Sequence, residues 1–308
     1  MDETPCANAI FQQPWWLDAV APGAWDEAVV ERDGRTVARL PYAVRGRGRW
    51  RLLTQPPLTQ TLGPWVEPSS AKPARALSHE MELLGALEAA LPPAAAFMQD
   101  FSPAILNGLP FFWAGYRIEL RYTYRLEGLR SEDDLWDGLR DNIRREIRKA
   151  RRLLEVRDDL GLDVLHSVWA KTFARQGTTP PHPPATLERL DAACAARGAR
   201  AMLFACDEAG RVHSATYVVW GARSAYYLLG GSDPQLRTSG AASLLMWEAI
   251  LRARSVTDAF DFEGSMLAPV ERFFRAFGAR QTPYLHVSRA TPVGRAALAV
   301  RSMTRRRR

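Results

Sequence analysis

Two stretches of the chain echo each other 161 to 162 residues apart, and this echo constrains the fold more than any other feature. The first runs from Asp100 to Leu120, and the second runs from Asp261 to Val287. Each stretch predicts a strand, a helix that carries two adjacent Phe residues, a glycine that ends the helix, and a second strand. A period of this length is typical of a duplicated domain rather than of a solenoid. We therefore expect two domains of similar fold in tandem.

The order of the predicted elements indicates an α+β fold, since helices precede an antiparallel meander and a strand–helix–strand unit. In the first half we expect helices over residues 14–20, 76–90 and 105–113, and strands over 26–31, 37–44, 49–54, 96–101 and 117–126. In the second half we expect helices over residues 132–139, 142–154, 160–175, 187–197, from 240 to 253 and 268–276, and strands over 199–207, 212–220, 224–230, 259–262 and 283–288. These elements divide the chain into an N-terminal domain (1–127), a C-terminal domain (128–290) and a basic tail (291–308).

Composition excludes several classes of protein. With 308 residues, of which 47% are apolar, the chain can fill two cores and is not disordered. Its three cysteines, Cys6, Cys194 and Cys206, follow no metal or disulfide spacing, so we expect no bound metal. No basic and apolar leader follows Met1, and no run of 18 apolar residues occurs. These features predict a cytoplasmic protein without a transmembrane segment.

The net charge of +7 is concentrated at the C-terminus, where five arginines stand at Arg301 and over 305–308. The rest of the chain is close to neutral. A solvated tail is one interpretation. The other is a patch that attracts RNA or makes weak contact with an anionic membrane.

A short segment rich in small residues reads as a turn that could hold a phosphate group. It lies between a predicted strand and a predicted helix, where small residues let the backbone approach an anion and the free N–H groups of the helix point at it. A tight strand-to-helix connection without a ligand is the alternative. The candidate cofactor-binding residues are Arg237, Ser239, Gly240, Ala241 and Ala242.

With these motifs the chain resembles the FemAB-like branch of the GNAT acyltransferase superfamily, over all but the tail. The phosphate motif of that superfamily reads Gln/Arg-x-x-Gly-x-Gly/Ala, and Arg237, Gly240 and Ala242 match it. The closing segment of FemAB-like proteins often carries an aromatic–lysine pair before a Phe-Gly. Here the pair is Phe274-Arg275, and an arginine can hold a phosphate or an oxyanion but cannot act as a base. The resemblance implies two GNAT-like domains in tandem, each with a mixed, mostly antiparallel sheet flanked by helices.

The resemblance also implies a reaction, in which an amine attacks a thioester or ester carbonyl and forms an amide. Glu263, Asp261 and His213 are candidate bases, and Tyr226 or Tyr227 could return a proton to the leaving group. Asp261 could instead cap the following helix. For His213, the sequence reveals no partner with which it could form a dyad. Backbone N–H groups near a bulge in the meander would stabilise the oxyanion. No Ser-His-Asp arrangement is evident, so we expect direct attack without a covalent intermediate.

Two donors are possible: acyl-CoA, which we place first, and aminoacyl-tRNA, which is the donor of the best-known FemAB relatives. Either would be a co-substrate rather than a permanently bound cofactor. Arg144, Arg145 and Arg148 lie on a basic helix that could meet phosphates or stay solvated. A non-catalytic module that binds RNA or membrane is the remaining alternative.

The acceptor is expected to be a small-molecule or peptide-like amine. Gln55 and Gln60 lie in a long loop rich in proline and are candidate acceptor contacts. Phe274, next to Arg275, is a further candidate for substrate contact.

Overall fold

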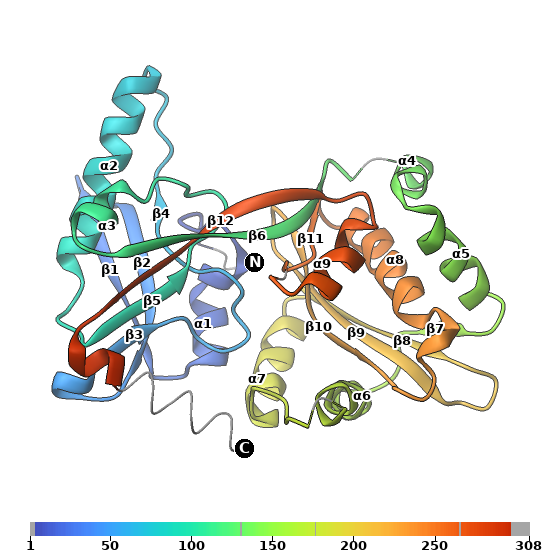
Figure 1. Cartoon of the computed structure of the whole chain (residues 1–308). Coiled ribbons are helices and arrows are strands. Elements are labelled where there is room, and N and C mark those ends of the chain that lie inside the picture. Colours follow the sequence, from blue (N-terminus) through green and yellow to red (C-terminus); the bar gives the residue numbers. More distant parts are fainter. Residues whose placement is uncertain (1–3, 130, 176, 265, 297–308) are drawn as a thin grey trace. The chain divides into compact units, whose positions relative to one another are not determined.

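The computed structural model describes residues 4–129, 131–175, 177–264 and 266–296 (Figure 1). Its contacts divide the chain into two compact units, the first formed by residues 1–121 and 283–308 and the second by residues 122–282. The boundaries drawn from the sequence, at 127 and 290, differ from this division because the last strand, β12 (Arg280–Ala290), pairs with β5 (Ala96–Asp100) of the first unit between His286 and Ala290.

The first unit contains the strands of the N-terminal half together with three short or medium helices. Its helices are α1 (Pro14–Val20), α2 (Pro73–Ala90) and α3 (Leu109–Trp113), with 3-10 turns η1 (Ile10–Gln12) and η2 (Gly48–Trp50). Its other strands are β1 (Trp25–Arg32), β2 (Arg35–Arg45), β3 (Leu52–Thr54), β4 (Trp65–Val66) and the beginning of β6 (Arg117–Glu127). The strand order is β1-β2-β3-β5-β12, with β4 also paired to β2.

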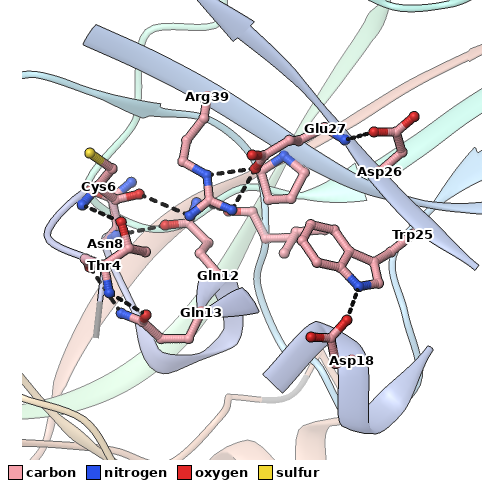
Figure 2. A network of polar contacts seen from close by, with 12 residues as sticks. Thr4, Cys6, Asn8, Gln12, Gln13, Asp18, Trp25, Asp26, Glu27 and Arg39 are labelled. Carbon is pink, nitrogen blue, oxygen red and sulfur yellow. Dashed lines mark hydrogen bonds and ion pairs between the residues drawn. The ribbon is translucent and has the colours of Figure 1, made fainter. Parts of the chain in front are cut away.

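The core of the first unit forms where α2 and α3 cover this sheet, and Phe97, Phe101 and Phe111 are packed in it. One charged side chain, Arg39 on β2, is only 4% exposed. Figure 2 shows how it is satisfied: Arg39 Nε donates to Glu27 Oε2 over 2.7 Å, and Nη1 donates to the Cys6 carbonyl over 3.4 Å. The pair therefore joins β1, β2 and the N-terminal segment.

The second unit holds most of the helices. They are α4 (Glu132–Gly138), α5 (Asp141–Ala150), α6 (Leu162–Ala174), α7 (Pro184–Ala195), α8 (Ala241–Arg254) and α9 (Ala268–Arg275), with a 3-10 turn η3 (Arg237–Ser239). Its strands besides the end of β6 are β7 (Glu155–Arg157), β8 (Arg200–Cys206), β9 (Val212–Trp220), β10 (Ala225–Ser232) and β11 (Ala259–Asp261).

The sheet of the second unit has the strand order β6-β11-β10-β9-β8-β7, in which only β10 and β11 are parallel. Helices α5, α8 and α9 cover one face and α6 and α7 the other (Figure 1). On the first of these faces, Trp247 of α8, Phe260 and Phe262 lie in a continuous apolar core. The sheet thus holds β10 and β11 at its centre, with helices above and below.

The predicted α+β architecture is confirmed, and most predicted elements are present within a few residues. The echo corresponds to β5–α3–β6 in one half and β11–α9–β12 in the other. Two short strands, β4 and β7, were not predicted; β7 is a charged edge strand, and charge on an edge strand discourages unwanted pairing. The helix expected from Ile105 starts only at Leu109, because Pro110 favours the first turn of a helix. In the part of the chain that the structure describes, none of the helices is both long and apolar enough to cross a membrane.

Candidate functional site

The centre of the site is a break in the pairing of β10. Its antiparallel register with β9 shifts between Tyr227 and Leu229, which is a bulge. On its other side β10 pairs with β11 only at Ala225 and Tyr226, although β10 continues to Ser232. Beyond Tyr226 the described residues therefore place no strand against this edge of β10, and its backbone can bind a ligand there.

The chain reverses directly after β11, and Glu263 lies in this reversal. Glu263 has φ 58°, a left-handed conformation that is uncommon for a residue other than glycine. The next residue, Gly264, has φ 46°, and a Cβ at this position would lie 2.5 Å from Thr123 Cα. Only glycine fits there. The reversal holds the Glu263 side chain beside the end of β11, in a strained backbone of the kind that clusters at functional sites.

Asp261, the last residue of β11, is 3% exposed and surrounded by donors. It accepts hydrogen bonds from the Thr123 hydroxyl and, over 2.8 Å, from the Glu263 backbone N–H. Arg125 Nε lies 3.6 Å from its Oδ2. Asp261 thus accepts two hydrogen bonds and lies beside a positive charge, surroundings that favour a carboxylate.

Glu263 is in the opposite situation. Its Oε1 is buried and has no hydrogen-bond partner among the residues described. Burial, and to a smaller degree the charge of Asp261, raises the pKa of the Glu263 carboxyl well above its usual range. A carboxyl whose pKa is raised by burial and by a neighbouring acid is a feature that clusters at functional sites.

Two tyrosines of β10 lie close to this pair. Burial, and then the charge of Asp261, raises the pKa of Tyr226. Burial and Glu263 raise the pKa of Tyr227 to about 12, so both phenols are protonated at neutral pH. The structure therefore brings together three of the predicted catalytic residues: Tyr226, Asp261 and Glu263.

The remaining two candidates on α9 have other contacts. Arg275 Nε donates to Glu271 Oε1 over 2.7 Å, and the same oxygen accepts the Tyr124 hydroxyl over 2.7 Å. Arg275 is thus paired with Glu271, one helical turn earlier on α9, and no contact between Arg275 and the acidic pair is seen among the described residues. Phe274 is 5% exposed and packs against Tyr227 in the core, which gives it a packing role under the site rather than a place at the surface.

The segment proposed from the sequence as a phosphate turn lies between β10 and α8, as its position in the chain predicted. Gly240, with φ 84°, is the N-cap of α8, and a Cβ there would lie 2.6 Å from the Glu146 carbonyl of α5. Arg237 and Ala242 are exposed, whereas Ser239 and Ala241 are buried. Gly240 has no side chain to cap the helix, and the Ala241 N–H donates to Ser239 Oγ over 3.4 Å, so the N–H groups of the following residues are the ones that could meet an anion.

The basic helix is α5, and its arginines have different surroundings. Arg144 Nη2 pairs with Asp141 Oδ1 at 2.5 Å, and the Arg148 guanidinium lies 5.4 Å from the centre of the Trp136 ring. Arg145 is exposed, and the described residues offer it no ion pair. The sequence did not single out Lys149, whose Nζ donates to the Thr238 carbonyl over 2.7 Å and so brings a cation to the phosphate turn.

The two glutamines lie in the loop after β3. Gln55 Oε1 accepts the Asp100 backbone N–H over 2.7 Å, and its Nε2 donates to the carbonyls of Thr59 and Gln60. Gln55 therefore shapes the loop. Both polar atoms of the Gln60 amide are buried without a partner among the described residues.

His213 does have a partner, contrary to the expectation from the sequence. Its Nε2 lies 3.1 Å from Asp207 Oδ2, and its Nδ1 lies 3.0 Å from Ser239 Oγ. An Asp–His–Ser arrangement is thus present. The sequence concealed it because Asp207 and Ser239 are 6 and 26 residues from His213.

No group of three or more His, Cys, Asp or Glu side chains that could hold a metal is found in the described part of the chain. The arginines of the tail at 301 and 305–308 lie outside the described residues.

Residues 138–275, within the second unit, match the acetyltransferase (GNAT) domain family. This match, together with the similar fold of FemX, confirms the predicted resemblance to the FemAB-like GNAT proteins. No curated protein sequence matches the chain.

Solved structures extend the likeness to the whole chain. FemX shares 14% identity over 91% of this chain and 92% of its own, with a TM-score of 0.67. The C-terminal domain of a protein described as a lysylphosphatidylglycerol synthetase from Agrobacterium fabrum shares 16% identity over 94% and 90%, with a TM-score of 0.55. A tandem GNAT protein from the clavulanic acid biosynthesis pathway shares 15% identity over 89% and 86%, with a TM-score of 0.50. At these identities the likeness concerns the fold, and it confirms the tandem GNAT-like architecture.

Proposed function

We propose that the protein is an amide-forming N-acyltransferase whose reaction takes place at the open edge of β10. The observation that carries this proposal is the Glu263 carboxyl, whose own pKa is raised and which lies close enough to Tyr227 to raise the pKa of that phenol, on the strand whose pairing with β9 shifts at a bulge. An amine acceptor must lose a proton as it forms the new C–N bond, and a buried carboxyl with a raised pKa is suited to receive it.

The proposed reaction transfers the acyl group from a thioester directly to the amine. The amine nitrogen attacks the carbonyl carbon of a thioester, and its proton passes to the Glu263 carboxylate. Backbone N–H groups at the bulge near Leu228 stabilise the oxyanion, which collapses as the C–S bond breaks. Tyr226 or Tyr227 is protonated at neutral pH and can supply the proton that the departing thiolate needs.

For the donor we propose acyl-CoA. The first turn of α8 offers N–H groups, and Lys149 and Arg237 bring positive charge to the same turn, which together suit a pyrophosphate. One of the similar solved structures is described as a tandem GNAT protein "without AcCoA". The proposed contacts with the pyrophosphate are made by Arg237, Ser239, Gly240, Ala241 and Ala242.

The test is an acyl-transfer assay on the purified protein with acetyl-CoA and a panel of amines that includes amino sugars and peptides. We expect release of free CoA that depends on the amine, and a product heavier than the amine by one acetyl group. Glu263→Gln should abolish most of this turnover, while Glu80→Gln, the same exchange on α2 of the first unit, should not. Absence of amine-dependent release with every acyl-CoA tried would contradict the proposed donor.

Aminoacyl-tRNA is the second candidate donor, because the exposed Arg145 on α5 has no ion pair among the described residues and could meet a phosphate. The resemblance to FemAB-like proteins points to the same donor. This route predicts that turnover is sensitive to ribonuclease. Arg145→Glu should then weaken tRNA binding and make it less steeply dependent on salt, because one phosphate contact and its released counterion are lost. Arg223→Glu, at an exposed arginine in the β9–β10 turn, serves as the control. Turnover that survives ribonuclease would exclude this route.

The proposed acceptor is a small-molecule or peptide-like amine, with Gln55 and Gln60 as the proposed contacts in the first unit. We also propose that the protein acts in the cytoplasm, since its three cysteines are free thiols.

A further inference from the structure

The segment between β10 and α8, residues 233–240, is held in place by contacts from three neighbouring elements of the second unit. From α6, Lys171 Nζ donates to Asp233 Oδ2 over 2.7 Å. From α5, Lys149 Nζ donates to the Thr238 carbonyl. From β9, His213 is bonded at both ends of its ring, to Asp207 and to Ser239. Only the third of these contacts reaches a side chain in the last turn before Gly240.

We propose that His213 is a positioning residue for this turn: it fixes Ser239, and through Ser239 the start of α8, in the geometry that binds the donor. The inference rests on the proposed function, because it takes the turn to be the donor site. Ser239 Oγ also lies 3.4 Å from the backbone N–H of Ala241, the first residue of α8, so one hydroxyl joins the histidine to the helix.

The direction of the hydrogen bonds supports this role. A carboxylate only accepts, so the bond to Asp207 requires a proton on His213 Nε2. In the neutral ring, Nδ1 then accepts from the Ser239 hydroxyl. In the charged ring, Nδ1 donates to Ser239, whose own proton goes to the Leu236 carbonyl at 3.0 Å. The bond between His213 and Ser239 therefore persists in both protonation states.

The surroundings of His213 keep its ring in this orientation. Asp207 is itself held by Arg211, whose Nε donates to Asp207 Oδ2 over 2.7 Å. The backbone carbonyl of His213 accepts the Asp233 N–H over 2.9 Å, and Asp233 is in turn paired with Lys171. His213 and Ser239 are 7% and 8% exposed. A hydroxyl that is buried and already shared between three groups is suited to hold a turn rather than to attack a substrate.

Two substitutions of His213 test the bonds of its two ring nitrogens separately. In His213→Asn the amide nitrogen can take the place of Nδ1 and keep the bond to Ser239. In His213→Gln the amide reaches the position of Nε2 and keeps only the bond to Asp207. His213→Ala removes both, and the Asn–Gln comparison stands even if the Ala variant folds poorly.

The experiment measures amide hydrogen exchange over residues 236–242 in the free protein, together with kcat and KM for acetyl-CoA. We expect faster exchange and a KM raised about tenfold in His213→Gln and His213→Ala, the effect of one lost hydrogen bond. We expect His213→Asn to stay near the wild type, and kcat and the exchange of β8 to change little in any variant.

Equal behaviour of the Asn and Gln variants, or unchanged exchange over residues 236–242 in His213→Ala, would overturn the positioning role. Faster exchange over residues 236–242 in His213→Ala and His213→Gln with an unchanged KM for acetyl-CoA would overturn the donor role of the turn, and with it the donor site of the proposed function. The contact between His213 and the turn would still stand.

Discussion

The backbone N–H of Glu263 donates a hydrogen bond to Asp261 Oδ1 over 2.8 Å, so the two acids at the end of β11 are joined through the main chain of one and the carboxylate of the other. The Thr123 hydroxyl also donates to Asp261 Oδ1, whereas Glu263 Oε1 has no hydrogen-bond partner among the described residues. The two acids therefore have different surroundings, and Glu263 is the one whose pKa is raised.

Replacing the buried acid should stabilise the protein at alkaline pH. The folded pKa of Glu263 lies above its unfolded value of 4.5, so the folded state of the wild type loses stability as the pH rises from 4.5 through the folded pKa. Glu263→Gln has no charge to bury. Thermal melting should therefore give a higher Tm for the variant than for the wild type at pH 8 and a much smaller difference near pH 4.5. A shift of equal size at both pH values would show that ionisation of Glu263 is not its cause.

Asp261→Asn should have the opposite effect. The amide oxygen can still accept from Thr123 and Glu263, but the uncharged amide removes one of the two carboxylates that lie beside Arg125, and its NH2 group then faces the guanidinium. We expect a cost of about 1–3 kcal/mol. Chemical denaturation at pH 7 measures this free energy of unfolding. A variant as stable as the wild type would mean that the contact to Arg125 contributes little.

Gly240→Ala should destabilise the second unit more than Gly210→Ala does. Both Gly240, φ 84°, and Gly210, φ 76°, are in the left-handed region, but a Cβ at Gly210 meets nothing within 4 Å while one at Gly240 would lie 2.6 Å from the Glu146 carbonyl. Gly210→Ala therefore measures the cost of the backbone conformation alone, about 1 kcal/mol. Gly240→Ala should cost about 1–3 kcal/mol more. Equal losses in urea unfolding would show that α5 can move away from the turn.

Glu27→Gln should destabilise the first unit, because it removes the carboxylate that pairs with the buried guanidinium of Arg39 (Figure 2). The expected loss is about 1–3 kcal/mol, smaller than for a fully buried pair since Glu27 is partly exposed. The exposed pair Arg32–Glu82 provides the control: Glu82→Gln should change the free energy of unfolding by less than about 1 kcal/mol. Similar losses in both variants would mean that the burial of Arg39 adds nothing.

Much of the fold could be predicted from the sequence because its signals are local. The paired phenylalanines of the echo mark a helix that buries one of the two: Phe111 in the first copy is fully buried, and Phe274 in the second nearly so. Gly240 could be recognised because a strand, a glycine and an apolar helix follow one another directly. Strand β7, with Glu155 and Arg157 on either side of Val156, carries no apolar alternation and escaped prediction.

The site could be predicted only in part, because its chemistry depends on contacts between distant residues. That Asp261 and Glu263 lie together follows from their spacing, but the partners of Asp261 are Thr123 and Arg125 of β6, and Thr123 is 138 residues away in the chain. The same holds for His213, whose partners come from a hairpin and from η3. The role of Phe274 also changes, since burial in the core is decided by how α9 packs on Tyr227.

The most direct test of the central claim is the pH dependence of kcat for acyl transfer from acetyl-CoA to an amine, in the wild type and in Glu263→Gln. The account predicts that kcat of the wild type rises with pH through the raised pKa of Glu263, above the ordinary glutamate value of about 4.3, and that the variant loses about 10²- to 10⁴-fold in kcat together with that rise. A variant that keeps the wild-type kcat and its pH profile would contradict the account.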